Sequence, residues 1–141
     1  MKFKKDGKNY VIVLSRDEEV ISSLAKFCKD EGISAAFFNA IGAVEKVEIG
    51  YYKLATKEYF FRREEGEFEV ASMNGNVALV DDNPFIHAHA VLTSCDEKGE
   101  VIGAHVKKAT VAVTLEIFLT VSGLPLSRVL DKEIGLKLLK M

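Results

Sequence analysis

The residues of this sequence best suited to chemistry are its three histidines, His87, His89 and His105, which lie in two neighbouring segments. In a β-strand, successive side chains alternate between the two faces, so His87 and His89 would lie on the same face. The polar run 96–100 contains Gly99 and predicts a hairpin turn, which would bring His105 beside His89. Neutral imidazole is the commonest metal ligand, and three histidines with one open position form a known type of catalytic zinc site.

A purely structural cluster would give the same sequence pattern. In that alternative the imidazoles are satisfied by backbone carbonyls and hydroxyls within a sheet or between subunits. The spacing of the histidines does not choose between a bound Zn²⁺ and such a cluster.

If the site belongs to a zinc enzyme, Glu116 is the candidate general base. Alternatively, it could orient a metal ligand by accepting a hydrogen bond from it. Asn39 and Thr114 are weaker candidates for residues that surround the metal ligands and contact a substrate. A carboxylate in so apolar a strand usually has a partner, here a histidine or a second subunit, although exposure on an outer face would also explain Glu116. The sequence contains no glycine-rich phosphate loop, no convergent arginines and no nucleophile motif. It therefore favours no enzyme class, and catalysis and ligand binding without turnover both remain open.

Composition limits the other classes of function. The chain has 141 residues, of which 48% are hydrophobic and 28% charged, which predicts one compact domain spanning residues 1–141. The formal net charge of −2 offers no basic surface for phosphates, so we do not expect direct DNA binding. No apolar run is long enough to span a membrane, and the first residues lack a signal-peptide pattern. Cys28 and Cys95 are expected to be free thiols of a cytoplasmic protein.

The pattern of apolar residues predicts one main helix and many strands. Ser15 and Glu18 form a capping-box signature, and the helical spacing that follows predicts a helix over about residues 16–31, ended by Gly32. Gly42 is expected to mark a bulge or a close backbone approach. The Asn74-Gly75 pair predicts a hairpin turn. The expected strands are 8–14, 33–43, 44–54, 57–63, 66–73, 76–81, 84–92, a second histidine strand around 103–106, and 110–121. The odd-numbered residues of 111–121 are expected on one face.

This pattern predicts an α+β fold, with an antiparallel or mixed β-sheet and one main helix near the N-terminus. One helix cannot cover both faces of so many two-sided apolar strands. The sequence therefore predicts self-association, without fixing the number of subunits.

A set of motifs, taken together and in order, resembles the PPC domain (plants and prokaryotes conserved). The resemblance extends over nearly the whole chain, from about Lys8 to Arg128. The motifs are Gly66-x-Phe68-Glu69-Val70-x-Ser72-Met73-x-Gly75, Pro84-Phe85-x-His87-x-His89-Ala90, Gly103-x-His105, Thr114-x-Glu116 and Gly123-Leu124-Pro125-Leu126-x-Arg128. One departure is Ala104, where the family often has a second glycine, and it alters only the local backbone freedom.

The resemblance implies an α+β domain that assembles into homotrimers. In plant members the domain follows an AT-hook, a short Arg-Gly-Arg-Pro segment that enters the DNA minor groove, and this sequence contains no such segment. Prokaryotic members carry DNA binding as a family label. The resemblance further implies an interaction module, associated with DNA regulation through protein partners, with zinc at His87, His89 and His105. The segment that contacts partners in the plant proteins matches Gly66, Glu67, Phe68, Glu69 and Val70 here.

Overall fold

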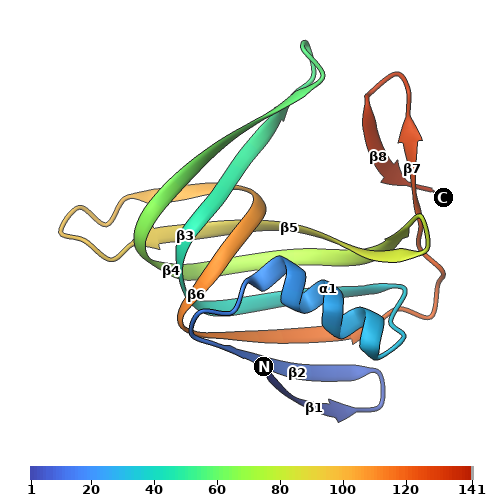
Figure 1. Ribbon diagram of the computed structural model, residues 1–141, viewed down its shortest axis with the longest axis horizontal. Coiled ribbons are helices and arrows are strands. Elements are labelled where there is room, and N and C mark those ends of the chain that lie inside the picture. Colours follow the sequence, from blue (N-terminus) through green and yellow to red (C-terminus); the bar gives the residue numbers. More distant parts are fainter. Residues whose placement is uncertain (141) are drawn as a thin grey trace.

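Antiparallel strands form most of the molecule. In the computed structural model, which describes residues 1–140, strands account for 69% of the chain and the single helix for 8%. In chain order the elements are β1 (Lys2–Asp6), β2 (Asn9–Ser15), α1 (Val20–Asp30), β3 (Ala36–Lys53), β4 (Glu58–Val80), β5 (Asn83–Ser94), β6 (Val101–Val121), β7 (Arg128–Asp131) and β8 (Leu136–Leu139). Figure 1 shows these elements with their labels.

One six-stranded sheet, in the order β1-β2-β6-β3-β4-β5, curves until it closes on itself. Closure comes from β6, whose C-terminal part pairs with β3 while its N-terminal part pairs with β5. Every strand pair in the sheet is antiparallel. His105 lies at the junction, because it pairs with His89 of β5 and with Gly50 of β3. The topology therefore brings distant parts of the chain to one point beside the histidines.

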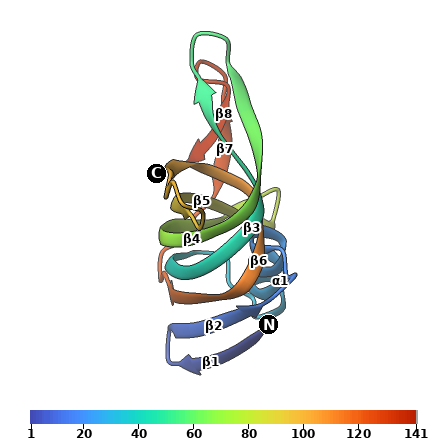
Figure 2. The ribbon, with the colours of Figure 1, turned by 90° about the vertical axis from the view of Figure 1, so that its left-hand side faces the viewer.

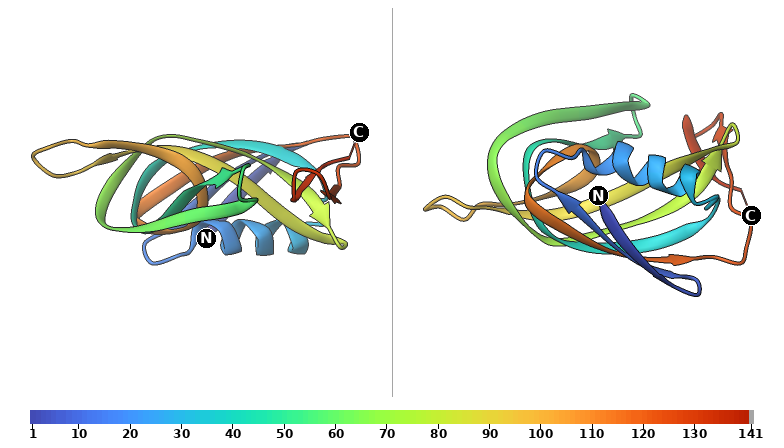
Figure 3. Two further views of the ribbon diagram at one scale, coloured as in Figure 1. Left: turned by 90° about the horizontal axis from the view of Figure 1, so that it is seen from above. Right: turned by 60° about the horizontal axis from the view of Figure 1, so that its bottom comes forward.

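The helix α1 closes one side of an apolar core. Val20, Leu24, Phe27 and Cys28 of α1 are buried against the sheet. α1 packs against β5 and β6, and Figure 3 shows it along one side of the strands. Among residues 1–140, every residue with a buried non-glycine side chain is hydrophobic. No helix in that range is long and apolar enough to cross a membrane.

Two hairpins extend from the closed sheet and meet (Figures 1 and 2). We call residues 47–64, the distal part of the β3–β4 hairpin, the arm. The second hairpin is β7–β8, which continues from a backbone pairing between Leu79 and Ser127. The hydroxyl of Tyr52 on the arm donates a hydrogen bond of 2.6 Å to the carbonyl oxygen of Ile134. The C-terminal hairpin is thereby held against the arm.

The predicted α+β class, with an antiparallel or mixed sheet and one main helix over about residues 16–31 near the N-terminus, is wrong in its class and in the place of its helix. The fold is mainly antiparallel β, and its helix begins at Val20, after two strands. The Ser15–Glu18 pair does form, since the backbone N–H of Ser15 donates to Glu18 Oε2 at 2.7 Å. The helix starts later because Asp17 adopts a left-handed φ of 68°. Glu19 then caps α1 by accepting hydrogen bonds from the N–H groups of residues 21 and 22.

The predicted turn at Asn74-Gly75 is also wrong, because both residues lie within the continuous strand β4. Gly75 pairs with Phe38, and a Cβ at this position would lie 2.5 Å from the Phe38 ring. The absence of a side chain at Gly75 therefore leaves room for the Phe38 ring of β3. The predicted bulge at Gly42 is confirmed by the register shifts around it, and a Cβ there would lie 2.2 Å from the carbonyl oxygen of Thr114.

Candidate functional site

Three imidazoles meet where β5 and β6 pair. His89 lies directly opposite His105, and His87 lies two residues from His89 on the same strand face. The ring centroids are 5.0 Å apart for His87–His89, 5.1 Å for His87–His105 and 5.5 Å for His89–His105. One nitrogen from each ring can be chosen so that the three atoms lie within 4.8 Å of one another. The predicted convergence of the three histidines is confirmed.

Local sequence fixes the register that brings the rings together. Asp96 Oδ1 accepts hydrogen bonds from the N–H groups of Lys98 at 2.9 Å and Gly99 at 3.1 Å, and Gly99 has a left-handed φ of 57°. This turn sets the β5–β6 pairing, as the sequence predicted. On the other side of His105, its strand partner Gly50 leaves room for the Phe61 ring. A Cβ at Gly50 would lie only 2.7 Å from that ring.

The arm places aromatic rings against the cluster. The Tyr59 ring lies 5.2 Å from the His105 ring and 5.1 Å from the Phe61 ring, which is itself 6.2 Å from His105. Tyr59 also packs edge-on against Tyr52, with 5.2 Å between the centroids. The histidines therefore have an apolar wall on the side of the arm.

Burial favours the neutral form of His87 and His105 at pH 7. The pKa of His87 is lowered to about 4, chiefly by burial and then by the positive charge of Arg128. Burial also lowers the pKa of His105, with His89 and Arg128 adding to the effect. An unprotonated ring nitrogen is the form that binds a metal ion.

The donor set fits a divalent transition metal. His105 Nδ1 is buried and has no hydrogen-bond partner among residues 1–140. Tetrahedral zinc with Zn–N distances of about 2.0–2.1 Å places its ligand nitrogens about 3.3–3.4 Å apart. Ligand atoms up to 4.8 Å apart would therefore have to approach one another by up to about 1.5 Å, which side-chain rotation can supply.

Arg128 also contacts the cluster. Its Nη2 lies 3.2 Å from His87 Nδ1 and donates to Asn76 Oδ1 at 2.9 Å. A guanidinium can only donate, so His87 Nδ1 is the acceptor and the neutral ring carries its proton on Nε2. An ion could therefore bind His87 at Nδ1 in place of the guanidinium, or at Nε2, in which case the neutral ring carries its proton on Nδ1 and no longer accepts from Arg128.

The other candidate residues lie elsewhere on the sheet. Glu116 is exposed and pairs with Val13 and Ile41. The hydroxyl of Thr114 donates to the carbonyl oxygen of Leu14 at 3.2 Å. Asn39 is exposed and lies in the same cross-strand row as His89, with Asn74 between them, so its backbone is about 10 Å away at the usual strand spacing. None of these three residues is hydrogen-bonded to a histidine within the described part of the chain.

The segment Gly66–Val70, which the resemblance associates with protein partners, forms part of β4. Phe68 and Val70 are buried, whereas Glu67 and Glu69 are exposed. The segment lines a hollow of about 180 Å³ together with Ser94 and Asp96. Only its two carboxylates and Gly66 are therefore available on the surface of the isolated chain.

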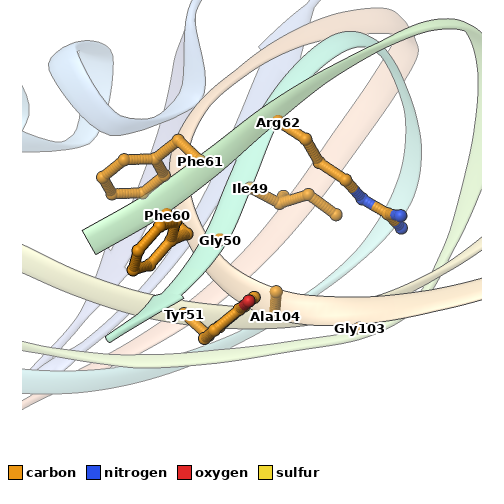
Figure 4. Close-up of a pocket in the computed structure, with 8 residues that line it drawn as sticks. All are labelled: Ile49, Gly50, Tyr51, Phe60, Phe61, Arg62, Gly103 and Ala104. Atoms are coloured by element: carbon orange, nitrogen blue, oxygen red, sulfur yellow. The ribbon is translucent and has the colours of Figure 1, made fainter. Parts of the chain in front are cut away.

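A pocket lies beside the histidines and is not lined by them. It has a volume of about 450 Å³, and Figure 4 shows Tyr51, Phe60 and Arg62 around it. Tyr51 and Phe60 stack with their centroids 5.8 Å apart. Since strand side chains alternate, these two rings lie on the opposite face of the arm from Phe61. His89 instead opens into a separate hollow of about 290 Å³.

Sequence reasoning assigned no role at the cluster to Arg128, Asn76, Tyr59 or Phe61. Arg128 was noted only as the end of a motif. Its distance from the histidines in sequence gives no signal, because the contact depends on how the C-terminal hairpin docks. Asn76 was expected at the start of a returning strand, yet it pairs directly with His87.

Comparison with known proteins supplies the relatives of this chain. The sequence profile of the Plants and Prokaryotes Conserved (PCC) domain matches residues 1–122. A plant- and prokaryote-conserved (PPC) protein from Pyrococcus horikoshii is 36% identical, with a TM-score of 0.87 over 99% of this chain and 95% of that chain. A protein from Archaeoglobus fulgidus described as metal-containing is 35% identical, with a TM-score of 0.87 over 100% of both chains. A candidate DNA-binding protein from Ralstonia eutropha JMP134 is 30% identical, with a TM-score of 0.90 over 99% of this chain and 96% of that chain. The curated proteins give no match.

Proposed function

This chain belongs to the Plants and Prokaryotes Conserved (PCC) domain family, and from that premise we propose that it is a self-assembling module that binds one Zn²⁺ ion through His87, His89 and His105. The observation that carries the proposal is the convergence of three imidazoles, one of which has a buried and unpartnered ring nitrogen. The description of the Archaeoglobus fulgidus relative as metal-containing gives further support.

The residues around the cluster favour binding over turnover. Zinc held by three imidazoles supplies a Lewis acid with an open position and a bound water of lowered pKa. Proton transfer would need a carboxylate or another base within hydrogen-bond reach. Glu116 pairs instead with Val13 and Ile41, and the cluster is bordered by Arg128 and aromatic rings. Catalysis at this site therefore remains the second candidate.

Exposed apolar side chains support self-assembly, and a homotrimer is the form we propose. On the outer face of β3, Phe37 is 60% exposed and Ile41 is 53% exposed. Phe118 of β6 is 48% exposed and lies between Val11 of β2 and Asn39 of β3. An apolar area spanning three strands is larger than isolated surface residues would give, and closed cyclic symmetry is the usual way to cover it. Glu116 lies in the same area, where a neighbouring subunit could pair with it.

Protein partners, more than DNA itself, fit the surface charge. The net charge of −2 offers no basic footprint for phosphates. On the segment Gly66–Val70, the exposed carboxylates of Glu67 and Glu69 could receive basic groups of a partner. Any association with DNA would then go through such partners.

Metal analysis of the purified protein tests the zinc proposal. We expect about one zinc per chain in the wild type and its loss in His89→Ala. Val91→Ala, which truncates an exposed residue two positions along the same strand face, is the matched control and should keep its zinc. A wild type without stoichiometric metal after growth and purification in zinc would refute the proposal.

Light scattering tests the assembly. Ile41→Lys places a charge within the exposed apolar area and should shift the trimer to monomers. Val101→Lys alters a residue that is also exposed, at 66%, but lies outside this area, and it should leave the mass unchanged. A wild type that is monomeric at micromolar concentration would contradict self-assembly.

A further inference from the structure

The guanidinium of Arg128 is built into the histidine cluster. The C-terminal hairpin carries Arg128 to it, and Nη1 donates to the carbonyl oxygen of Lys137 at 3.2 Å, which fixes the side chain against its own hairpin. Nη2 bridges His87 and Asn76 at 3.2 Å and 2.9 Å. The guanidinium carbon lies 5.7 Å from the centre of the Phe85 ring. These contacts hold the cation in one place.

No negative charge balances this cation. Within residues 1–140, none of the ion pairs includes Arg128, and the atoms that accept its hydrogen bonds belong to an amide, a carbonyl and a neutral imidazole. Its Nε is buried without a hydrogen-bond partner. A partly buried charge with neither a counter-charge nor full hydrogen bonding is costly. The site therefore has an excess of positive charge, which a bound divalent ion would increase.

The free groups around the cluster are mostly donors. Asn76 Oδ1 and His87 Nδ1 are both used by Arg128, which leaves the amide N–H groups of Asn76 to donate. The hydroxyl of Tyr59, whose ring lies 5.2 Å from that of His105, can also donate. The rings of Tyr59 and Phe61 offer an apolar wall beside these donors. Donors around an uncompensated cation select an anion, and a carboxylate or phosphate oxygen can accept from the Nη1 N–H group that these contacts leave free.

We propose that the histidine cluster binds a small organic oxyanion, a carboxylate or phosphate group carried on an apolar body, with Arg128 as the residue that holds its charge. The inference rests on the proposed function in that it names the ligand class of the same metal site. The oxyanion supplies the missing counter-charge, and the apolar body packs on the aromatic wall of the arm.

Two probes with the same apolar body distinguish the acidic groups. Binding of benzoate and of phenyl phosphate is measured by isothermal titration calorimetry, on zinc-loaded protein and on protein freed of metal with a chelator. We expect saturable binding of at least one probe, and the tighter of the two identifies the acid. Arg128→Met should weaken this binding at least tenfold, and Arg128→Lys should fall between, because an ammonium keeps the charge and loses the fork. Arg16→Met, which removes an exposed arginine of the segment between β2 and α1, is the control and should bind as the wild type does.

Asn76→Asp tests the same idea without removing Arg128. The carboxylate keeps an acceptor for Nη2 and adds the counter-charge that the site lacks, so the protein should fold as the wild type does while anion binding falls at least tenfold. Failure of both probes to bind, or binding unchanged in Arg128→Met and Asn76→Asp, would overturn the inference.

Separate metal analysis of the same samples keeps the two proposals apart. Zinc retained without Arg128-dependent anion binding overturns this inference and leaves the proposed zinc site standing. Arg128-dependent binding by a protein that holds no zinc after growth and purification in zinc supports the oxyanion site and overturns the zinc proposal.

Discussion

The lowered pKa of His87 predicts that the metal-free protein loses stability as the pH falls from 7.5 to 5. The unfolded chain binds a proton at His87 near pH 6.5, whereas the folded chain resists protonation until about pH 4. The unfolded state therefore takes up more protons between these values, and the free energy of unfolding falls as the pH decreases through this window. Above pH 6.5, His87 is unprotonated in both the folded and the unfolded chain. It then no longer lowers the free energy of unfolding, which is at its maximum. His105 acts in the same direction, because its pKa is also lowered.

The magnitude follows from the pH interval. At about 1.4 kcal/mol per pH unit, protonation of the unfolded chain from pH 6.5 to 5 corresponds to about 2 kcal/mol. Because His87 is only half-buried, solvent screening reduces this to about 1 kcal/mol. The pH range ends at 5 because protonation of carboxylates, which also changes the free energy of unfolding, occurs mainly below that pH.

Urea denaturation in the presence of a chelator, at pH 7.5, 6.5, 5.5 and 5, measures this loss. His87→Asn is the matched control, since its Oδ1 can still accept from Arg128 while the titrating group is removed. The variant should lose about 1 kcal/mol less than the wild type over this range. Equal losses in the two proteins, or a wild type that gains stability towards pH 5, would refute the reasoning.

Three further predictions concern the fold that holds the site. Gly75→Ala should lower the free energy of unfolding by about 1–3 kcal/mol in urea denaturation, because its Cβ would lie 2.5 Å from the carbonyl oxygen of His87. Gly103→Ala, whose nearest contact would be 3.4 Å, should lower it little, and equal effects would contradict the packing argument. Glu19→Ala should lower the free energy of unfolding by about 1–2 kcal/mol, since Glu19 caps α1 and accepts from the N–H of Ala109 at 3.2 Å. Glu19→Gln should keep most of this stability, and an alanine variant as stable as the wild type in thermal or urea unfolding would refute the cap. A thiol reagent at pH 8 should modify exposed Cys95 rapidly and Cys28 only after denaturation, because burial raises the pKa of Cys28 to about 12; two fast thiols in the native protein would contradict this.

The histidine cluster could be predicted from the sequence because its causes are local. Alternation along β5 puts His87 and His89 on one face, and the turn at Gly99 brings back His105. Both features depend on a few consecutive residues. The bulge at Gly42 was predictable for the same reason, since a glycine inside an apolar strand marks a close backbone approach.

Features that depend on distant partners could not be predicted. The Asn74-Gly75 pair has the local signature of a turn, yet Gly75 is set by the Phe38 ring of a different strand. Val113 was expected on the face of Leu115, but the three residues 42–44 of β3 oppose the five residues 111–115 of β6, and the resulting bulge leaves Val113 68% exposed. Arg128 reaches His87 only because its hairpin docks on the arm.

X-ray absorption at the zinc K-edge tests the central claim most directly, on protein purified with its metal. The account predicts a first shell with three imidazole nitrogens at about 2.0–2.1 Å and one further light atom. A shell with sulfur ligands, or with no imidazole signature, would contradict it.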